Sequence, residues 1–407
     1  MMQLTAKYFF IFLISFIQFY NSGNSISSVL TYLLLTSLFI FNIYKIHAGY
    51  KNNSLKLFYS KSDLLIALFV FAIIRSFFAN AIGFSTLIYL VFILVFFTLL
   101  IKSDIQKPHF FRSVLLAFCW IVVVNLLLYL IGINADIFEK KVDLHDSRIL
   151  EYIGISLQRS RFFIFNNFAY YAMMLGILFI GRNYIALNNK YLKYAIIGSL
   201  LLSFLILDAR GPFFALIIVI VFRNILYKIN SFGFFIFCFA IGVIPFAYSL
   251  ISIYLGLQSQ DNLAIVSSRD ILWQAFFLNY DPSLVQFVFG YGYLGQYISG
   301  ISAEYEYLFT NWGNASQISL HNSYLQYIMD LGIIGLLLLY YIIRNTFKKI
   351  EYLKHNELKL LIYYFLLLGI SDMSIQFNKF NVFYFFIVIA HLVEYNYRQR
   401  NLISVQV

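Results

Sequence analysis

The feature that most constrains this chain is a series of apolar runs, each long enough to cross a lipid bilayer as a helix. A spanning segment must satisfy its backbone hydrogen bonds internally, which favours helices of about 20 apolar residues. We predict an all-α polytopic membrane protein that forms a single membrane domain over residues 1–407. Its twelve spans are expected near residues 4–20, 26–44, 64–80, 83–101, 111–132, 162–181, 191–207, 211–227, 232–255, 322–343, 358–371 and 381–395.

The composition excludes a soluble globular protein of this length. Of the 407 residues, 61% are hydrophobic and only 12% are charged, and a soluble domain could not bury so much apolar surface. We expect residues 4–20 to be retained as a span; the alternative is a cleaved signal peptide, for which residues 21–25 are a poor cleavage site. Cys119 and Cys238 lie inside apolar runs and indicate neither a disulfide nor a metal site.

Basic residues in the connections predict the orientation, because positively charged loops stay on the cytoplasmic side. With both termini inside, the inner segments hold 20 of the 29 Lys and Arg residues and only five of the 18 Asp and Glu residues. The net charge of +11 is therefore a topology signal, and it gives no reason to expect a nucleic-acid partner. We expect a multi-pass protein with both termini in the cytoplasm.

The basic residues outside these inner segments are enriched in arginine. Orientation alone does not favour arginine over lysine, whereas phosphate recognition does, because the guanidinium fork binds phosphate oxygens in a bidentate way. The enrichment therefore indicates a phosphate-bearing ligand. These residues are Arg75, Lys140, Lys141, Arg148, Arg159, Arg161, Arg210, Arg269 and Lys379.

Two predicted outer connections are long, at residues 133–161 and 256–321, and the others are short. Long connections in compact proteins are usually functional or disordered. The second, between helices nine and ten, is too aromatic for a disordered segment. We expect it to fold into short helices on the outer surface. Its aromatic residues include Trp273, Tyr280, Tyr291, Tyr293, Tyr297 and Trp312.

The first candidate segment is Arg159-Ser160-Arg161, followed by Asn166 and Asn167 at the start of span six. Two arginines at this spacing could bracket an anion, and asparagines inside a membrane helix need partners. Alternatively, the arginines snorkel to the interface and the asparagines bond to a neighbouring helix. For Arg159 we favour that alternative.

The second candidate is the short turn Asp208-Ala209-Arg210-Gly211-Pro212. We expect Pro212 at the first helical position and Arg210 at the helix N-terminus, where exposed amides also attract anions. The alternative is a local ion pair between Asp208 and Arg210. We favour a binding role, because a charged pair in such a short turn is expensive and replaceable.

The third candidate lies in the large connection, where Ser267 and Ser268 precede Arg269. A serine N-cap would begin a short helix and place Arg269 and Trp273 one turn apart on one face. The cation could then meet a phosphate while the indole stacks on a sugar. The alternative is a cation–π pair that fixes the loop.

The fourth candidate runs from His321-Asn322-Ser323-Tyr324-Leu325 to Gly332 and Gly335. We expect His321 to open span ten, where the helix dipole disfavours imidazolium and leaves the ring able to accept a proton. A capping histidine at the interface is the alternative. Both glycines are expected to share a helical face with His321, Leu325 and Ile328 and to admit a neighbouring helix.

Taken in order, these segments resemble the superfamily of Wzy-type O-antigen polymerases and O-antigen ligases over roughly the second half of the chain. The stretch from His321 to Gly335, after a long outer loop, is the most specific part. Two places depart from the family pattern. Ala209 stands where a serine is often found, and Asn166-Asn167 stands where Pro-Asn is common.

The resemblance implies a GT-C-like membrane glycosyltransferase without metal or cofactor. Its substrates would be undecaprenyl-diphosphate-linked oligosaccharides at the outer face of the bacterial inner membrane. We expect Arg161, Arg210 and Arg269 to hold the diphosphate and His321 to accept the proton of the acceptor hydroxyl. Alternatively His321 binds phosphate, with Asp208 or Asp270 as the base. Further substrate-binding candidates are Arg159, Asn167, Trp273, Asn322 and Tyr324. Expected partners are the lipid-linked substrate, membrane lipids and, from the resemblance, a chain-length regulator.

Three functions remain open. We favour a polymerase of repeat units. Both the donor and the acceptor of a polymerase vary in their sugars, and this suits a chain with an unusual sequence that is rich in Phe and Tyr. The first alternative is a ligase that transfers the finished chain to a lipid A core. The second is a transporter or flippase of the same lipids, a class that commonly has paired halves and ionisable groups at the midplane. Arg75 in span three is the one residue that favours transport.

Overall fold

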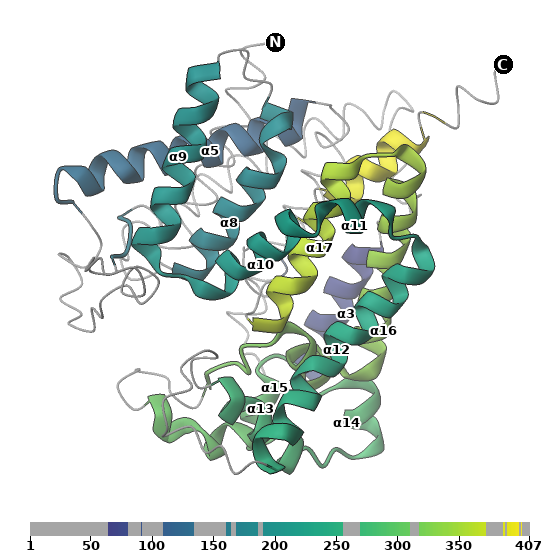
Figure 1. The fold of residues 1–407 in the computed structure, drawn as a ribbon. Coiled ribbons are helices and arrows are strands. Elements are labelled where there is room, and N and C mark those ends of the chain that lie inside the picture. The colour runs from purple at the N-terminus through teal and green to yellow at the C-terminus, as the bar shows by residue number, and fades with distance from the viewer. Residues whose placement is uncertain are drawn as a thin grey trace.

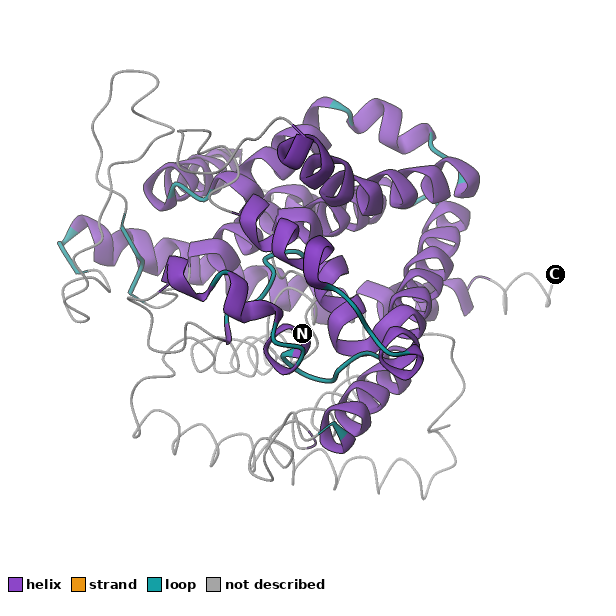
Figure 2. Ribbon diagram, turned by 90° about the horizontal axis from the view of Figure 1, so that it is seen from below, coloured by secondary structure: helices purple, strands orange, loops and turns teal. Residues whose placement is uncertain are grey.

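The structure, a computed structural model, describes residues 64–79, 91, 109–133, 160–163, 168–185, 190–254, 269–309, 317–371, 386, 389–398 and 400. Within these ranges every regular element is a helix and none is a strand (Figure 2), in agreement with the predicted all-α class. The spans predicted at 4–20 and 26–44, almost all of 83–101 and part of 381–395 lie outside the described residues. The total of twelve therefore stays a prediction.

The other predicted spans are helices close to the expected positions. Two regions, Ser231–Ile251 and Ser323–Leu353, are long and apolar enough to cross a membrane, and Ile66–Phe78, Val114–Leu130, Tyr194–Leu207 and Arg210–Val221 are shorter apolar helices. The full elements are α3 (Leu64–Phe78), α5 (His109–Leu130), α8 (Phe168–Gly181), α9 (Lys190–Leu207), α10 (Arg210–Val221), α12 (Ser231–Tyr254), α16 (Ser323–Leu353) and α17 (Asn356–Ser371).

Three boundaries differ from the prediction. The helix α16 continues to Leu353, although its span was predicted to end at residue 343. The helix expected from residue 162 is α8, described from Phe168, and residues 160–163 are non-helical. There the Ser160 N–H donates to Ile206 O of α9. The span expected at 211–227 is divided at Phe222 (φ −90°, ψ 9°) into α10 and α11 (Arg223–Lys228). The short 3-10 helix η2 (Arg182–Ile185) follows α8.

Residues 269–309 of the large connection fold into short helices, as expected. Figure 1 shows α13, α14 and α15 gathered at one end of α12 and α16. A second apolar cluster, with Trp273, Phe276, Tyr305 and Leu325 among its buried members, holds this part to the start of α16. The elements are α13 (Arg269–Asn279), α14 (Leu284–Phe289), α15 (Gly295–Ile298), η3 (Ile301–Glu304) and η4 (Glu306–Phe309).

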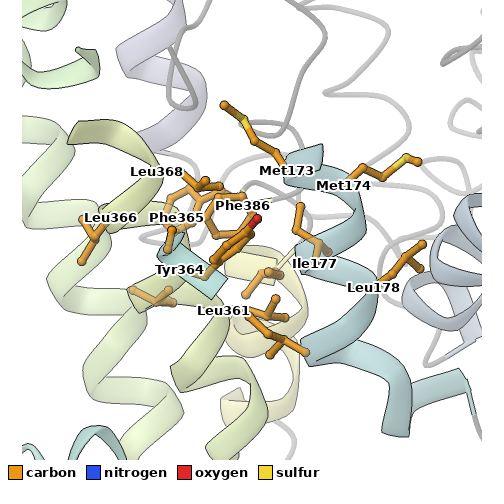
Figure 3. Close-up of a cluster of buried hydrophobic side chains, with 14 of the residues drawn as sticks. Met173, Met174, Ile177, Leu178, Leu361, Tyr364, Phe365, Leu366, Leu368 and Phe386 are labelled. Atoms are coloured by element: carbon orange, nitrogen blue, oxygen red, sulfur yellow. The ribbon is translucent and has the colours of Figure 1, made fainter. Parts of the chain in front are cut away.

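The main core forms around α17, which contacts α8, α10, α12 and α16. A helix that is apolar on all sides is buried on all sides, and Leu361, Tyr364 and Leu368 are fully buried. Figure 3 shows Tyr364 beside Ile177 of α8. Gly176 of α8 makes room for this ring, because a Cβ at that position would overlap the Tyr364 side chain.

The long helix α16 is broken at Gly332. The φ of 64° and ψ of −167° at this residue belong to a backbone region that is open essentially only to glycine. On one side of the break, two carbonyls accept hydrogen bonds from the large connection. Met329 O accepts from Tyr291 N at 2.7 Å, and Asp330 O accepts from Gly292 N at 2.9 Å. The connection therefore docks backbone to backbone into the broken helix.

The predicted role of the two motif glycines is wrong in one respect. Because Gly332 leaves the helical conformation, it does not continue a helical face with His321, Leu325 and Ile328. A Cβ on Gly332 would overlap the carbonyl group of Val288 in the large connection. The close neighbour of Gly332 is thus the backbone of the short helix α14 (Leu284–Phe289) in this connection and not another predicted span.

Replacing Gly332 by alanine is expected to destabilise the protein by about 1–3 kcal/mol from backbone strain alone, and further because the methyl group displaces Val288. Gly242→Ala in α12 is the matched control, since a Cβ there meets nothing within 4 Å. Thermal unfolding of both purified variants in detergent measures the difference. Equal melting temperatures would show that the break does not require glycine.

Candidate functional site

The C-terminal end of α17 brings two of the candidate segments together. The Asn322 Nδ2 donates to Ile370 O at 2.9 Å, and an ideal Cβ on Gly211 would lie 2.7 Å from the Ser371 Oγ. His321 directly precedes Asn322, and Arg210 directly precedes Gly211. Two segments that are far apart in the sequence therefore meet at residues 370–371.

Residues 160–163 join the same region through the end of α9. The Ser160 N–H donates to Ile206 O at 3.2 Å, shortly before the turn that contains Arg210. Phe162 is fully buried, and its ring centroid lies 5.0 Å from that of Tyr171. This anchor fixes the backbone beside Arg161, whose side chain is partly exposed. The other candidates of this segment, Arg159, Asn166 and Asn167, lie outside the described residues.

The turn between α9 and α10 has a left-handed residue, Asp208, with a φ of 47°. Arg210 is the first residue of α10 and is partly exposed, so its predicted place at a helix N-terminus is confirmed. The N-cap is Ala209, which makes no side-chain cap hydrogen bond. Pro212 occupies the third helical position and not the first, because the helix begins at Arg210.

His321 lies just before α16 and does not cap it. The cap is Asn322, whose Oδ1 accepts hydrogen bonds from the N–H groups of Tyr324 and Leu325, both at 3.0 Å. The expectation that His321 opens the helix is therefore corrected, because asparagine supplies the acceptor that an N-cap needs. His321 is partly exposed and has a left-handed φ of 48°, which is uncommon for residues other than glycine.

Asn322 and Tyr324 attach the start of α16 to α17. The Asn322 amide is fully buried and donates to Ile370 O, as described above. The Tyr324 hydroxyl donates to Leu366 O at 2.6 Å. The polar groups of both side chains thus form hydrogen bonds within the protein. Contact of these residues with a substrate stays a prediction.

The helix α13 places Arg269 and Trp273 one turn apart, as predicted, and Arg269 is its first residue. The Trp273 Nε1 donates to Leu320 O at 3.1 Å, which holds the residue just before His321. The indole is 3% exposed and packs edge-on against Tyr248 with 6.0 Å between ring centroids. The ring that was expected to stack on a sugar is therefore buried inside the protein.

A buried polar network supports the same backbone from the other side. Gln326 accepts from the Leu320 N–H at 3.2 Å through its Oε1, and its Nε2 donates to Asp330 Oδ1 at 2.8 Å and to Gln296 Oε1 at 2.6 Å. Asp330 Oδ1 also accepts from Gly295 N at 2.9 Å. Gln296 donates in turn to Ile318 O at 3.1 Å. The segment that directly precedes His321, residues 318–320, is thus held by side-chain amides.

Tyr305 completes this support, since its hydroxyl donates to Ile318 O at 2.8 Å. Burial raises the pKa of the Tyr305 hydroxyl well above its usual value, so it remains a hydrogen-bond donor over the physiological range. Gln296, Gln326 and Tyr305 are not among the site residues predicted from the sequence. The one available signal was a polar Gln326 and an acidic Asp330 inside an otherwise apolar predicted span, where such groups need partners.

The arrangement can combine an imidazole with guanidinium groups. His321, Arg210, Arg161 and Arg269 are all partly exposed. The segments of His321 and Arg210 both contact the end of α17, that of Arg269 bonds to Leu320, and that of Arg161 bonds to the end of α9. Cationic groups held in this way could stabilise negative charge that develops on a leaving phosphate. Within the described residues, no group of three or more His, Cys, Asp or Glu side chains is placed to hold a metal ion.

Comparison with known families finds a match over part of the chain. Residues 195–340 match a family model described as O-antigen ligase. The match extends from α9 into α16 and includes Arg210, Arg269 and His321. No curated protein matches the chain. Residues 195–340 are therefore similar to the O-antigen ligase family, which supports the resemblance to the superfamily of O-antigen ligases and polymerases.

Proposed function

We propose that this protein is a polysaccharide polymerase of the O-antigen type. It would transfer a glycan chain from undecaprenyl diphosphate onto a lipid-linked repeat unit at the outer face of the bacterial inner membrane. The observation that carries the proposal is the convergence of four candidate segments. Gly211 lies against Ser371, Asn322 bonds to Ile370, and Trp273 bonds to Leu320. The fourth segment joins through Ser160 and the end of α9.

In the proposed reaction, the bond between the anomeric carbon of the donor sugar and the diphosphate oxygen breaks. A new bond forms from that carbon to the acceptor hydroxyl oxygen, and His321 takes the hydroxyl proton. Undecaprenyl diphosphate leaves with the bonding electron pair. Arg161, Arg210 and Arg269 stabilise its charge, and no metal takes part.

The remaining candidates fall into two groups. Arg159 and Asn167 are proposed to contact the substrate, as expected from the sequence. Trp273, Asn322 and Tyr324 have internal hydrogen bonds, which supports a role in positioning Arg269 and His321. A chain-length regulator is a further proposed partner.

The alternative is a ligase that transfers the finished chain to a lipid A core, and the match to the O-antigen ligase family model is compatible with either reaction. The transporter alternative loses its one specific support. Arg75, the charged residue inside a predicted span, donates from Nε and Nη2 to Gly290 O at 2.9 and 2.5 Å. This arginine therefore has a structural partner and needs no transported ion to explain it.

A strain that lacks this gene, complemented with wild type or with His321→Ala, tests the proposal on a gel of surface polysaccharide. A polymerase predicts a single capped repeat in place of the long ladder, with the ladder restored by wild type only. Long lipid-linked chains that fail to reach the core would establish the ligase instead. Full restoration by His321→Ala would remove His321 from the mechanism.

Arg210→Lys and Arg269→Lys keep the charge but lose the guanidinium fork. Loss of a charge-assisted hydrogen bond is worth about 1.5–3 kcal/mol, which corresponds to about a ten- to hundredfold lower kcat/KM with a lipid-diphosphate donor. Arg223→Lys in α11 is the control, because this exposed residue lies outside the candidate segments. Unchanged kcat/KM in the first two variants would rule out bidentate binding of the diphosphate.

Gln326→Leu removes the acceptor of the Leu320 N–H and is expected to lower kcat per folded molecule while leaving KM for the donor nearly unchanged. Thr346→Val is the matched control. Its hydroxyl, also buried in α16, donates only to Ile342 O of its own helix at 3.0 Å. Both variants should lose stability, but only Gln326→Leu should lose turnover. Equal turnover in the two would show that the network has no effect on His321.

A further inference from the structure

The large connection contains a stretch without charge. Between Asp281 and Glu304, residues 282–303 include no Asp, Glu, Lys or Arg. Within it, α14 carries large apolar side chains that face outward. Leu284 is 79% exposed, Val285 60% and Phe287 45%. A contiguous apolar surface of this kind marks a contact with another apolar phase or partner.

The helix α14 does not have the sequence of a water-exposed helix. Apart from Gln286, each of its residues is apolar, and none of them is buried. Gln286 is engaged at the N-terminus, where it forms a capping box with Ser283. A helix of this length is not stable alone in water. A helix that is apolar all round needs an apolar environment on its outer side too.

Two predicted spanning helices hold α14 on its inner side. Arg75 of α3 donates twice to the carbonyl of Gly290, the C-cap of α14. The rings of Phe71 and Phe289 lie 6.4 Å apart between centroids. The Tyr293 N–H donates to the Ser76 Oγ at 2.9 Å. The contact of Gly332 with Val288 joins the same stretch to α16. The exposed face of α14 is therefore continuous with the outer surface of the helical bundle.

The surroundings of Arg75 in the predicted spanning helix α3 indicate the depth in the membrane at which α14 lies. Phe77 and Phe78 follow Arg75 towards the end of α3, and they are 46% and 74% exposed. Because Phe77 and Phe78 are exposed and lie closer to the end of α3 than Arg75, the apolar environment around α3 extends beyond the position of Arg75. A charged side chain at such a level requires a polar partner within the protein, and the Gly290 carbonyl provides it. The C-terminus of α14 thus lies at the level of an apolar stretch of α3.

We propose that α14 inserts into the outer leaflet of the membrane, with Leu284, Val285 and Phe287 in contact with lipid acyl chains. The large connection would then be anchored in the bilayer at this point and would not lie wholly in water. The absence of charge over residues 282–303 argues against a charged protein surface or phosphate groups as the partner of this face. The inference goes beyond the proposed function and is independent of which reaction the protein catalyses.

Spin labels on the full-length protein test this. Leu284→Cys and Val285→Cys would be labelled with a nitroxide in a Cys119→Ala, Cys238→Ala background and reconstituted in vesicles of phosphatidylethanolamine and phosphatidylglycerol. Power-saturation measurements give the accessibility of each label to oxygen, which partitions into lipid, and to a water-soluble nickel chelate. Phe239→Cys, 66% exposed in α12, is the lipid reference. Glu306→Cys, exposed in η4, is the aqueous reference.

Both α14 labels are expected to match the α12 label, with high oxygen accessibility and several-fold lower nickel accessibility than the η4 label. Nickel accessibility equal to that of the η4 label would place α14 in water and overturn the proposal. Low accessibility to both reagents would also overturn it, because a protein surface would then cover this face.

Discussion

The docking of the large connection into the broken helix α16 is the contact on which both the candidate site and the loop geometry depend. At Gly332 the helix gives up its regular hydrogen bonding, and the carbonyls of Met329 and Asp330 accept from Tyr291 and Gly292. The Asp330 side chain accepts from Gly295 and Gln326 as well. One residue therefore joins α16 to the connection through its main chain and its side chain together.

From this contact the support of His321 can be followed step by step. Asp330 orients Gln326, which accepts from Leu320, while Trp273 donates to the carbonyl of the same residue. Leu320 is thus held at both of its backbone polar groups, and the next residue adopts the left-handed conformation. Such a conformation costs about 1–3 kcal/mol and persists only where the surroundings fix it. The buried bonds on either side of His321 provide that constraint, which is the physical basis for giving it a functional role.

The helices could be predicted from the sequence because a spanning helix satisfies its hydrogen bonds locally. Apolar runs therefore located α9, α12 and α17 to within two residues, and they located the start of α16 but not its end at Leu353. The break at Gly332 could not be found in this way, because a glycine in an apolar run equally suits a close contact between helices. Its conformation depends on Val288 and Gly290, which are distant in the sequence. The same reason explains the N-cap, where Asn322 rather than His321 bonds to the first turn.

The residues of the candidate site were predicted from their side-chain chemistry. The structure shows which of them have hydrogen-bond partners within the protein. Trp273 and Tyr324 were selected because they can contact sugars, yet each donates to a main-chain carbonyl that only the fold brings near. Gln296 and Gln326 were not predicted, because a neutral side-chain amide does not by itself indicate a catalytic or binding role. Together they nevertheless hold the backbone before His321. The residue pattern thus predicts the segments better than the roles of single residues within them.

Arg75 refines the meaning of the arginine enrichment outside the inner segments. A guanidinium fork tolerates partial desolvation and can serve either a phosphate or a backbone carbonyl. At Arg75 the partner is the Gly290 carbonyl, so this arginine gives no support to a phosphate site. Arg161, Arg210 and Arg269 differ in position, since each lies in a segment that leads to the junction of α17 with His321. The case for a diphosphate ligand therefore rests on the segments in which these three arginines lie and not on how many arginines the outer segments contain.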